Sequence, residues 1–456
     1  MALKTLILAA GQGTRMRSAR PKVLHEIANR SLLEHVYDTS KLIESNEIIV
    51  IYGHGGELVK QTLSTLDAQW IEQKEQLGTG HAVMQAESLI ANEDTVLILY
   101  GDVPLLTKDS INGLLTNVSE QSLALLTVNL ANPTGYGRIV RDQQHKVVKI
   151  TEHKDANEQE LLIQEVNTGI LAVKGDNLKQ WISRLDNSNA QKEFYLTDVI
   201  EMAVKDGIEV KTSQPKGPDE VLGVNNRKQL SHLERVFQLQ QADSLMVQGV
   251  TLADPARLDC RGSFVSLGQD ISVDINVIFE GKNSIGNNVS IGANTIITNS
   301  VIADDVQILA NCIIDNATVG AGSKVGPYAR LRPQAELAEQ VHIGNFVEIK
   351  KSTVAKGSKI NHLSYIGDAS IGSGVNIGAG TITCNYDGVN KFRTVIEDGA
   401  FIGSDTQLIA PVTVGKNATI GAGSTITKDT PDEKLSLSRA KQITLQNWQR
   451  PVKKEQ

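Results

Sequence analysis

Aliphatic residues recur at every sixth position through much of the C-terminal half of the chain, from about Leu258 to Thr427. This period matches neither the 3.6 residues of a helical turn nor the alternation of a plain strand. It is typical of a solenoid in which short strands meet at corners and each sends one aliphatic side chain inward. Two stretches carry the pattern in strict register: Ile396, Ile402, Leu408, Val414, Ile420, Ile426, and Val319, Val325, Leu331, Leu337, Ile343, Ile349.

Small residues and short steps mark the expected corners. Glycine often follows the aliphatic residue, as in Ile343-Gly344 and Ile420-Gly421, where a tight turn tolerates no larger side chain. Steps of five, such as Ile349 to Val354, predict corners tightened by one residue. The alternative is a sandwich of unrelated short strands, which would not hold one register over so many repeats.

The first half alternates between two other patterns. Apolar, β-rich runs at Lys4–Ala10, Glu47–Tyr52, Thr95–Tyr100 and Leu123–Val128 predict strands, and helical patterns such as Leu32–Glu44 and Gly80–Ile90 lie between them. This alternation predicts an α/β, Rossmann-like domain with a mostly parallel sheet covered on both faces and ligands at the carboxyl ends of its strands.

A single long helix is expected to join the two halves. Asn226 to Gln248 places Leu230, Leu233, Phe237 and Leu245 on one stripe, as in an amphipathic helix. We therefore predict a first domain at residues 1–226, a linker helix at 227–248, and a solenoid with an irregular or partly helical tail at 249–456.

Composition excludes several classes. A chain of 456 residues exceeds one ordinary core, and a formal net charge of −7 argues against nucleic acid as a partner. No run of about twenty apolar residues predicts a membrane span. Cys260, Cys312 and Cys384 are widely spaced and odd in number, which favours reduced thiols in the cytoplasm, and no Cys/His cluster has zinc spacing.

The ladder is interrupted once, between Ile382 and Ile396, by a segment rich in polar, aromatic and basic residues (Thr383–Thr394). Insertions leave a solenoid as loops on one face and are often binding elements. A neutral insertion is the alternative, but the density of chemically active side chains favours a functional loop.

The first predicted strand runs into a glycine-rich turn, Leu8-Ala-Ala-Gly11-Gln-Gly13-Thr-Arg15-Met16. It matches neither a complete dinucleotide fingerprint nor a P-loop. Its backbone N–H groups could still approach phosphate oxygens, with Arg15 and Lys22 supplying positive charge. Asp102, just after the strand Thr95–Tyr100, is well placed for Mg²⁺, which takes few protein oxygens alongside phosphates and water.

Taken together, the motifs of the first half resemble the sugar-nucleotide pyrophosphorylases. Joined to the ladder, the whole chain resembles the bacterial bifunctional N-acetylglucosamine-1-phosphate uridylyltransferase/glucosamine-1-phosphate acetyltransferases, with a left-handed parallel β-helix of hexapeptide repeats. The motifs are the turn above with Pro21-Lys22, Gln76-Leu-Gly-Thr-Gly80, Tyr100-Gly-Asp102, Gly135-Tyr-Gly-Arg138, Glu152-His-Lys-Asp155, Asn167-Thr-Gly169 and Gly223-Val-Asn-Asn226.

The resemblance implies synthesis of UDP-N-acetylglucosamine from UTP, acetyl-CoA and glucosamine-1-phosphate. In the first domain, Arg15 and Lys22 would be catalytic and Asp102 and Asn225 would ligate Mg²⁺. The remaining residues that it implies for UDP-N-acetylglucosamine are Leu8, Ala9, Gly11, Gln73, Gly78, Thr79, Tyr100, Gly101, Gly137, Glu152 and Asn167.

In the solenoid, His362 would be the general base that accepts the proton of the attacking amine, a task that suits imidazole near neutral pH. Glu348 is our candidate for its orienting carboxylate. The resemblance implies Arg332, Lys350, Tyr365 and Asn376 for the sugar phosphate, and Ala379, Asn385, Tyr386, Ser404, Ala422 and Arg439 for acetyl-CoA. It also implies a homotrimer with this site between subunits.

Spacing supports part of this assignment. Arg332 and Lys350 are 18 positions apart, about one coil, so they should stack on one face, whereas His362 is 12 further on and should lie on another. Two alternatives remain: a nucleotidyltransferase whose solenoid only oligomerises or regulates, and a non-catalytic scaffold of the same architecture.

Overall fold

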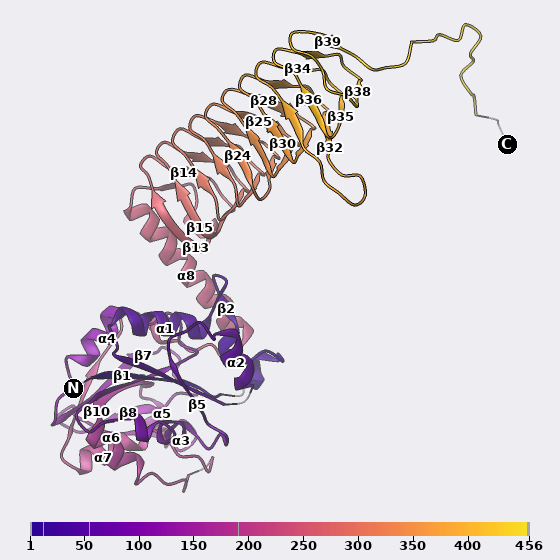
Figure 1. Ribbon diagram of the computed structural model, residues 1–456. Coiled ribbons are helices and arrows are strands. Elements are labelled where there is room, and N and C mark those ends of the chain that lie inside the picture. The colour runs from indigo at the N-terminus through magenta and orange to yellow at the C-terminus, as the bar shows by residue number, and fades with distance from the viewer. Residues whose placement is uncertain (1, 12, 54, 190, 454–456) are drawn as a thin grey trace. The chain divides into compact units, whose positions relative to one another are not determined.

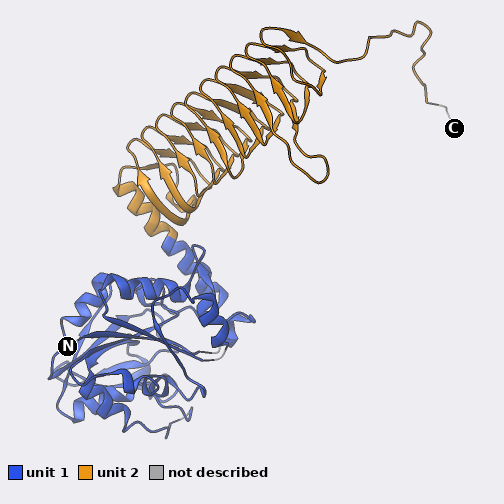
Figure 2. Ribbon diagram, viewed as in Figure 1, with its two compact units in different colours: residues 1–237 blue, residues 238–456 orange. Residues whose placement is uncertain are grey.

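The computed structural model describes residues 2–11, 13–53, 55–189 and 191–453. The chain separates into two compact units, Met1–Phe237 and Gln238–Gln456 (Figure 2). Each is described here by itself.

The first unit is built on a nine-stranded sheet with the order β11-β7-β10-β6-β1-β4-β5 and a β8/β9 hairpin attached to β10. Strands β1, β4, β5, β6, β7 and β11 are parallel, and β10 runs against its neighbours β6 and β7. The mostly parallel sheet predicted from the sequence is thus confirmed. The strands are β1 Leu3–Ala9, β4 Glu47–Tyr52, β5 Gln69–Glu72, β6 Thr95–Tyr100, β7 Ser122–Asn129, β8 Arg138–Arg141, β9 Val147–Thr151, β10 Glu165–Lys174 and β11 Glu209–Ser213. A separate small hairpin pairs β2 Glu26–Ile27 with β3 Arg30–Ser31.

Both faces of this sheet are buried, because alternate residues of each strand enter different cores. In β1, Leu6 and Leu8 join one core, and Ile7 and Ala9 join the other. Helices α3 Thr79–Met84, α6 Gly175–Ile182 and α7 Asp198–Lys205 cover the first face, and α1 Leu32–Leu42, α2 Gly56–Thr62 and α4 Lys108–Leu115 cover the second (Figure 1). A short helix, α5 Glu158–Leu161, follows β9.

Two predicted helices are shorter than expected. Helix α1 ends at Leu42 rather than Glu44, since Glu44 adopts a left-handed φ of 59°. Helix α3 ends at Met84, and only a 3₁₀ turn, Glu87–Leu89, continues the predicted range to Ile90.

The long helix α8 spans Arg227–Val247, close to the predicted range. Leu233 is buried in a core of the first unit, whereas Ala242 and Leu245 are buried in the core of the second. The predicted stripe is therefore divided between two cores, and the domain boundaries at 226 and 248 stay a prediction.

The second unit is a parallel β-helix with three strands per coil (Figure 1). The first face comprises β12 Thr251–Leu252, β14 Ser272–Val273, β16 Ser290–Ile291, β19 Gln307–Ile308, β22 Lys324–Val325, β25 His342–Asn345, β28 Lys359–His362, β31 Asn376–Ile377, β34 Phe401–Ile402, β37 Thr419–Ile420 and β39 Leu435–Ser436. The second face comprises β17 Ile296–Thr298, β20 Ile313–Asp315, β23 Arg330–Leu331, β26 Glu348–Lys350, β29 Tyr365–Gly367, β32 Ile382–Cys384, β35 Gln407–Ile409 and β38 Thr425–Ile426. The third face comprises β18 Val301–Ile302, β21 Thr318–Val319, β24 Ala335–Leu337, β27 Ser352–Val354, β30 Ala369–Ile371, β33 Thr394–Ile396 and β36 Val412–Val414. Strands β13 Leu258–Leu267 and β15 Val277–Ile285 begin the second and third faces.

The predicted ladder forms the core of this prism. All twelve aliphatic residues named above are buried. The steps of five fall at the corner between the second and third faces, where Asn299, Lys351 and Asp368 take left-handed φ angles of 46°, 46° and 49°. Gly344 shows why small residues follow the ladder, since a Cβ there would lie 2.0 Å from the carbonyl oxygen of Asn361 in the next coil.

The predicted interruption is a loop between β32 and β33, which leaves the stack in Figure 1. A single bridge between Tyr386 and Lys391 closes it. After β39 the described chain, to Lys453, forms no further helix or strand, so the tail is irregular and the partly helical alternative is wrong. Among the described residues, no helix combines the length and apolarity that crossing a bilayer requires.

Candidate functional sites

A cavity of about 430 Å³ opens at the carboxyl ends of β1, β5 and β6. This is the edge of an open α/β sheet where ligands bind. Its lining collects most of the residues predicted for the nucleotide: Leu8, Ala9, Gly11, Lys22, Gln73, Gly78, Thr79, Tyr100 and Asp102.

Two cations and two oxygen-bearing side chains meet where Lys22 and Asp102 line this cavity. Lys22 Nζ donates to Asp102 Oδ2 and also lies 3.3 Å from Asn225 Oδ1. Arg15 Nη2 donates to the same Asn225 oxygen at 2.9 Å. The four residues come from segments as far apart as 15 and 225, so only the fold brings them together.

The glycine-rich turn is shaped by a close approach. Gly13 has a left-handed φ of 65°, and a Cβ there would lie 2.7 Å from Cβ of Lys22. Glycine is thus required for Lys22 to reach Asp102. Gln12, part of the predicted motif, lies outside the described residues.

These side chains suit a hard cation such as Mg²⁺. The ammonium of Lys22 bridges Asp102 Oδ2 and Asn225 Oδ1, which shows that both oxygens can face one positive charge. In the described part of the chain, no group of three or more His, Cys, Asp or Glu side chains could hold a metal. Two protein oxygens are nevertheless usual for Mg²⁺ when phosphates and water supply the rest.

Three further residues predicted for UDP-N-acetylglucosamine, Gly137, Glu152 and Asn167, are not part of the cavity lining but lie close to one another. Asn167 N donates to the Gly137 carbonyl at 2.9 Å, and Thr197 Oγ1 donates to Glu152 Oε1 at 3.2 Å. A Cβ on Gly137 would lie only 2.8 Å from Cγ2 of Ile150 and 3.4 Å from Glu152 Oε1, so this carboxylate lies directly beside Gly137. Burial raises the pKa of Glu152, and the Thr197 hydrogen bond opposes that shift.

Gly101 closes the strand edge between these groups. Its N–H donates to the Leu8 carbonyl at 2.9 Å. Burial raises the pKa of Tyr100, with the charges of Glu152 and Asp102 adding to the effect. The phenol is therefore neutral and close to the carboxylates of both Glu152 and Asp102.

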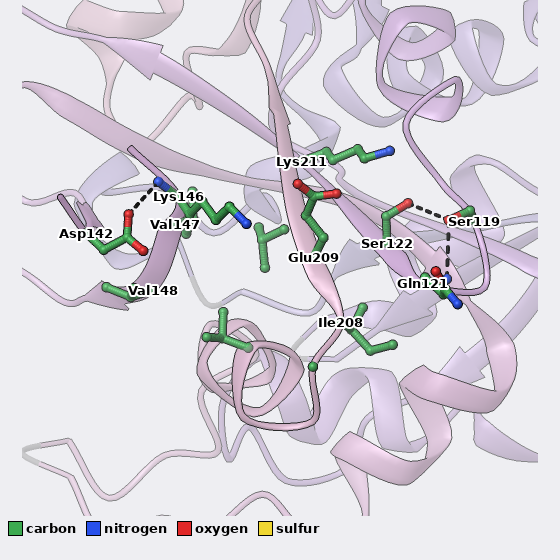
Figure 3. A pocket seen from close by; sticks show the side chains of 13 residues that line it. Ser119, Gln121, Ser122, Asp142, Lys146, Val147, Val148, Ile208, Glu209 and Lys211 are labelled. Carbon is green, nitrogen blue, oxygen red and sulfur yellow. Dashed lines mark hydrogen bonds between the residues drawn. The ribbon is translucent and has the colours of Figure 1, made fainter. Parts of the chain in front are cut away.

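A second cavity of about 470 Å³ lies at the opposite edge of the sheet, beside the amino ends of β7 and β11 (Figure 3). Its side chains hydrogen-bond to their own neighbours, as Ser119 does with Ser122. Its lining includes Asp142, Lys146, Glu209 and Lys211 but none of the residues predicted for the nucleotide or for Mg²⁺.

In the second unit, three cations gather on the second face. Arg332 follows β23 and Lys350 ends β26, at matching positions of adjacent coils as predicted, and Lys391 reaches them from the protruding loop. The ammonium of Lys391 beside Lys350 lowers the pKa of Lys350, and Arg332 adds to this effect. Such mutual repulsion is relieved by an anion such as phosphate.

Lys391 was not identified from the sequence as a single residue. The only signal was the basic and polar composition of its loop. Its pairing with Lys350 depends on how the loop folds back across the bridge at Tyr386.

The expected contact between Glu348 and His362 is not present. Its Oε1 accepts from Arg332 Nη1 at 2.7 Å on the second face, whereas His362 ends β28 on the first face. No hydrogen bond involving the imidazole of His362 is found in the part of the chain that the structure describes.

Tyr365 joins the cations and Asn376 does not. Tyr365 begins β29, directly beside Glu348, whereas Asn376 lies on the first face between Lys359 and Phe401. A single copy of this chain therefore does not gather all four residues predicted for the sugar phosphate.

His362 stands at the corner between the first and second faces, in line with three residues predicted for acetyl-CoA. The pairing of Ile360, Ile377, Ile402 and Ile420 places His362, Ala379, Ser404 and Ala422 at one position of successive coils. Arg439 Nη1 extends this line by donating to the Ala422 carbonyl at 3.1 Å.

The loop residues Asn385 and Tyr386 differ in exposure. Asn385 is buried, and its amide donates to Asp368 Oδ2 at 2.5 Å, so it anchors the loop. Tyr386 is exposed and available to a ligand.

Comparisons with known proteins agree with this division. Residues 5–160 match the MobA-like NTP transferase domain, residues 393–428 the bacterial transferase hexapeptide (six repeats), and residues 263–343 the GMPPB C-terminal domain. Bifunctional protein GlmU of Methylococcus capsulatus is 60% identical over 99% of this chain and 98% of its own length. The chain belongs to the bifunctional GlmU family.

Two further GlmU proteins are similar to this chain over their full or nearly full length: that of Marinobacter nauticus is 55% identical over 99% of both chains, and that of Idiomarina loihiensis is 56% identical over the full length of both. As a GlmU family member, the chain is a transferase with a nucleotidyltransferase domain and a hexapeptide-repeat domain.

Proposed function

We propose that each unit performs one step in the synthesis of UDP-N-acetylglucosamine. The second unit acetylates glucosamine-1-phosphate, and the first transfers UMP from UTP to the product. The observation that supports this most directly is that two different chemical clusters lie on two compact units. One is Lys22 with Asp102 and Asn225, and the other is Lys350 with Lys391 beside the corner that carries His362.

In the first unit, the sugar phosphate oxygen attacks the α-phosphorus of UTP, and the bond to pyrophosphate breaks. Arg15 and Lys22 neutralise charge that develops on the phosphates, which is the main requirement of phosphoryl transfer. Asp102 and Asn225 would hold Mg²⁺, which would supply further positive charge. Gln73, Gly78 and Thr79 bind the uridine end, while Gly137, Glu152 and Asn167 bind the sugar.

In the second unit, the amine of glucosamine-1-phosphate attacks the thioester carbonyl of acetyl-CoA, and the thiolate of CoA leaves. His362 accepts the amine proton. Arg332, Lys350 and Lys391 bind the phosphate, with Tyr365 beside them. The corner line of Ala379, Ser404 and Ala422, with Arg439 and Tyr386, contacts acetyl-CoA.

An inert solenoid would not need this cation cluster, which argues against the reading of the second unit as only an oligomerisation or regulatory element. The ammonium groups of Lys350 and Lys391 repel each other, and a bound anion would relieve that repulsion. The exposed imidazole one corner away supplies the base that acetyl transfer requires.

Reciprocal variants test the division. Asp102→Ala should abolish uridylyl transfer and leave acetylation at wild-type rate, and His362→Ala should lower acetylation by about 10²–10⁴-fold and spare uridylyl transfer. Each variant is the folding control for the other. Loss of both activities in either variant would contradict the assignment of one step to each unit.

We further propose that the second unit forms a homotrimer. An exposed apolar stripe, Tyr328, Phe346 and Leu363, occupies one corner position in three successive coils and adjoins His362; the three side chains are 51%, 57% and 63% exposed. The rings of Tyr328 and Phe346 stack with centroids 5.2 Å apart. A stripe of this kind on a hexapeptide-repeat domain suits contact with further copies.

The backbone conformation at these three positions also indicates an interface. All three residues have left-handed φ angles, between 50° and 57°, which bulky side chains rarely adopt. Earlier coils place Asn276, Asn294 and Asn311 at the equivalent corner position. Folding alone favours asparagine there, so the apolar residues point to an interface.

Phe346→Asn tests the trimer without a folding penalty, because asparagine suits this backbone. We expect light scattering to show dissociation and acetylation to fall, with uridylyl transfer and the thermal stability of the monomer retained. A variant that remains trimeric with full acetylation would refute the role of this stripe.

The chain is assigned to the cytoplasm. Cys260, Cys312 and Cys384 are free thiols, and burial raises the pKa of Cys260 to about 12 and that of Cys312 to about 11. Buried, unreactive thiols of this kind fit a reducing compartment.

A further inference from the structure

The first turn of helix α8 contacts one of the two residues that would hold Mg²⁺. Asn225 N donates to Gln229 Oε1 at 2.9 Å, and Gln229 N donates to Asn226 Oδ1 at 2.9 Å. In a capping box, a side chain at the position of Gln229 bonds the backbone N–H of the residue that precedes the helix, here Asn226. The Gln229 side chain instead reaches one residue further back, so its hydrogen bond holds the backbone of Asn225.

The amide of Asn225 has a defined orientation. Its Nδ2 donates to the Gly223 carbonyl at 3.4 Å, and its Oδ1 accepts from Arg15 at 2.9 Å and from Lys22 at 3.3 Å. Arginine and lysine side chains only donate hydrogen bonds, so the oxygen of this amide must face them. A metal ion that enters beside Lys22 would therefore meet Asn225 Oδ1.

The residue before Asn225 is bonded to the other candidate ligand. Val224 N donates to the Asp102 carbonyl at 2.9 Å. Two successive backbone N–H groups are thus held, that of Val224 by Asp102 and that of Asn225 by Gln229. Together these two bonds define where the backbone that carries Asn225 Oδ1 lies relative to Asp102.

Helix α8 is packed against the same site. Leu233 lies four residues after Gln229, on the same face of the helix. It is buried in one core cluster with Met16 of the glycine-rich turn and with Val224. The helix therefore holds the half-buried Gln229 side chain at a fixed place beside the candidate metal ligands.

We propose that Gln229 is a positioning residue for the metal site of the first unit. Its amide oxygen holds the backbone of Asn225 so that Asn225 Oδ1 and Asp102 Oδ2 face the same Mg²⁺. The inference rests on the proposed function, in which Asp102 and Asn225 hold this ion. Gln229 acts through Asn225 and is not itself a ligand.

Two substitutions separate this role from simple support of the fold. Gln229→Met keeps the length of the side chain and removes the acceptor, whereas Gln229→Glu keeps an oxygen that accepts the Asn225 N–H. The measurement is the Kd of Mn²⁺, determined by electron paramagnetic resonance on the full-length protein saturated with UDP-N-acetylglucosamine, which does not react without pyrophosphate. We expect Gln229→Met to weaken Mn²⁺ binding about tenfold, as loss of a hydrogen-bond partner of a metal ligand does, and Gln229→Glu to stay within about threefold of wild type.

Binding of UDP-N-acetylglucosamine in EDTA is the second readout, because a general disturbance of the cavity would weaken it as well. It should stay within about twofold of wild type in both variants. Gln240→Met, at an exposed position of the same helix, is the matched control and should change neither Kd.

Three results would overturn the proposal: unchanged Mn²⁺ affinity in Gln229→Met, equal weakening of Mn²⁺ binding by both Gln229 variants, or equal loss of Mn²⁺ binding and of metal-free nucleotide binding. Failure of the proposed function is distinguishable, because the wild-type protein itself would then bind no Mn²⁺ in the presence of UDP-N-acetylglucosamine.

Discussion

The first coil of the β-helix is closed by one side chain of helix α8. Gln238 is 1% exposed, and its amide bonds both backbone groups of Cys260 in β13: Cys260 N donates to Oε1 at 2.6 Å, and Nε2 donates to the carbonyl at 3.1 Å. The amide thus takes the place that a preceding strand would have. Terminal repeats of solenoids need such a cap, because their outer edge is otherwise unpaired.

Gln238→Leu should remove this cap and destabilise the second unit. Two buried backbone groups lose their partners, each at a cost of about 1–3 kcal/mol, and burial of the leucine side chain offsets part of the loss. We expect a net loss of about 2–4 kcal/mol. In a unit of this size that lowers the unfolding temperature by roughly 5–15 °C.

Calorimetry and thermal inactivation of acetylation measure the effect, at one protein concentration because subunit association contributes to stability. Gln240→Leu is the matched control, since Gln240 is exposed on the same helix. Gln238→Glu should be worse than Gln238→Leu at neutral pH, because an ionised carboxylate cannot donate to the Cys260 carbonyl. Its deficit should shrink as pH falls, since protonation restores a donor. An unfolding temperature for Gln238→Leu within about 1 °C of that for Gln240→Leu would refute the reasoning.

Two further variants probe the reaction sites. Lys391→Ala should raise KM for glucosamine-1-phosphate about tenfold while leaving uridylyl transfer intact, because it removes one of three cations on the second face. Lys356→Ala is the control, since it removes an exposed lysine that is paired with Glu339. Equal effects of the two variants on KM would contradict a role of the cation cluster in binding the phosphate. Thr197→Val removes the hydrogen bond that lowers the pKa of Glu152, so the acid limb of uridylyl transfer should move to higher pH; a pH profile that does not move would show that Glu152 need not be ionised.

The sequence predicted the β-helix closely because its signal is periodic. Every residue of the two ladders is buried, and even the five-residue steps fall at real corners, since one inward side chain per strand leaves little freedom of register. Helix ends could not be predicted as closely. Helix α1 ends just before Glu44, which adopts a left-handed φ angle, and hydrophobic periodicity does not indicate such a backbone conformation.

Contacts between side chains could be predicted only where the repeat itself sets them. Coil spacing placed Arg332 beside Lys350 correctly. The partner of Glu348 was missed, because Arg332 competes for that carboxylate on the same face. Lys391 was missed because its position depends on loop folding, and the contact between Gln229 and Asn225 was missed because hydrophobic periodicity does not indicate which backbone group a polar side chain bonds.

The corner line from His362 to Ala422 has one further consequence. Successive coils are about 4.8 Å apart, so if acetyl-CoA lies along this line as proposed, the number of coils sets the distance that it has to span. Adding or deleting a whole coil between His362 and Ser404 would preserve every rung yet change the span that the pantetheine arm has to cover. In this architecture, the number of coils would therefore determine the length of the acyl donor that fits.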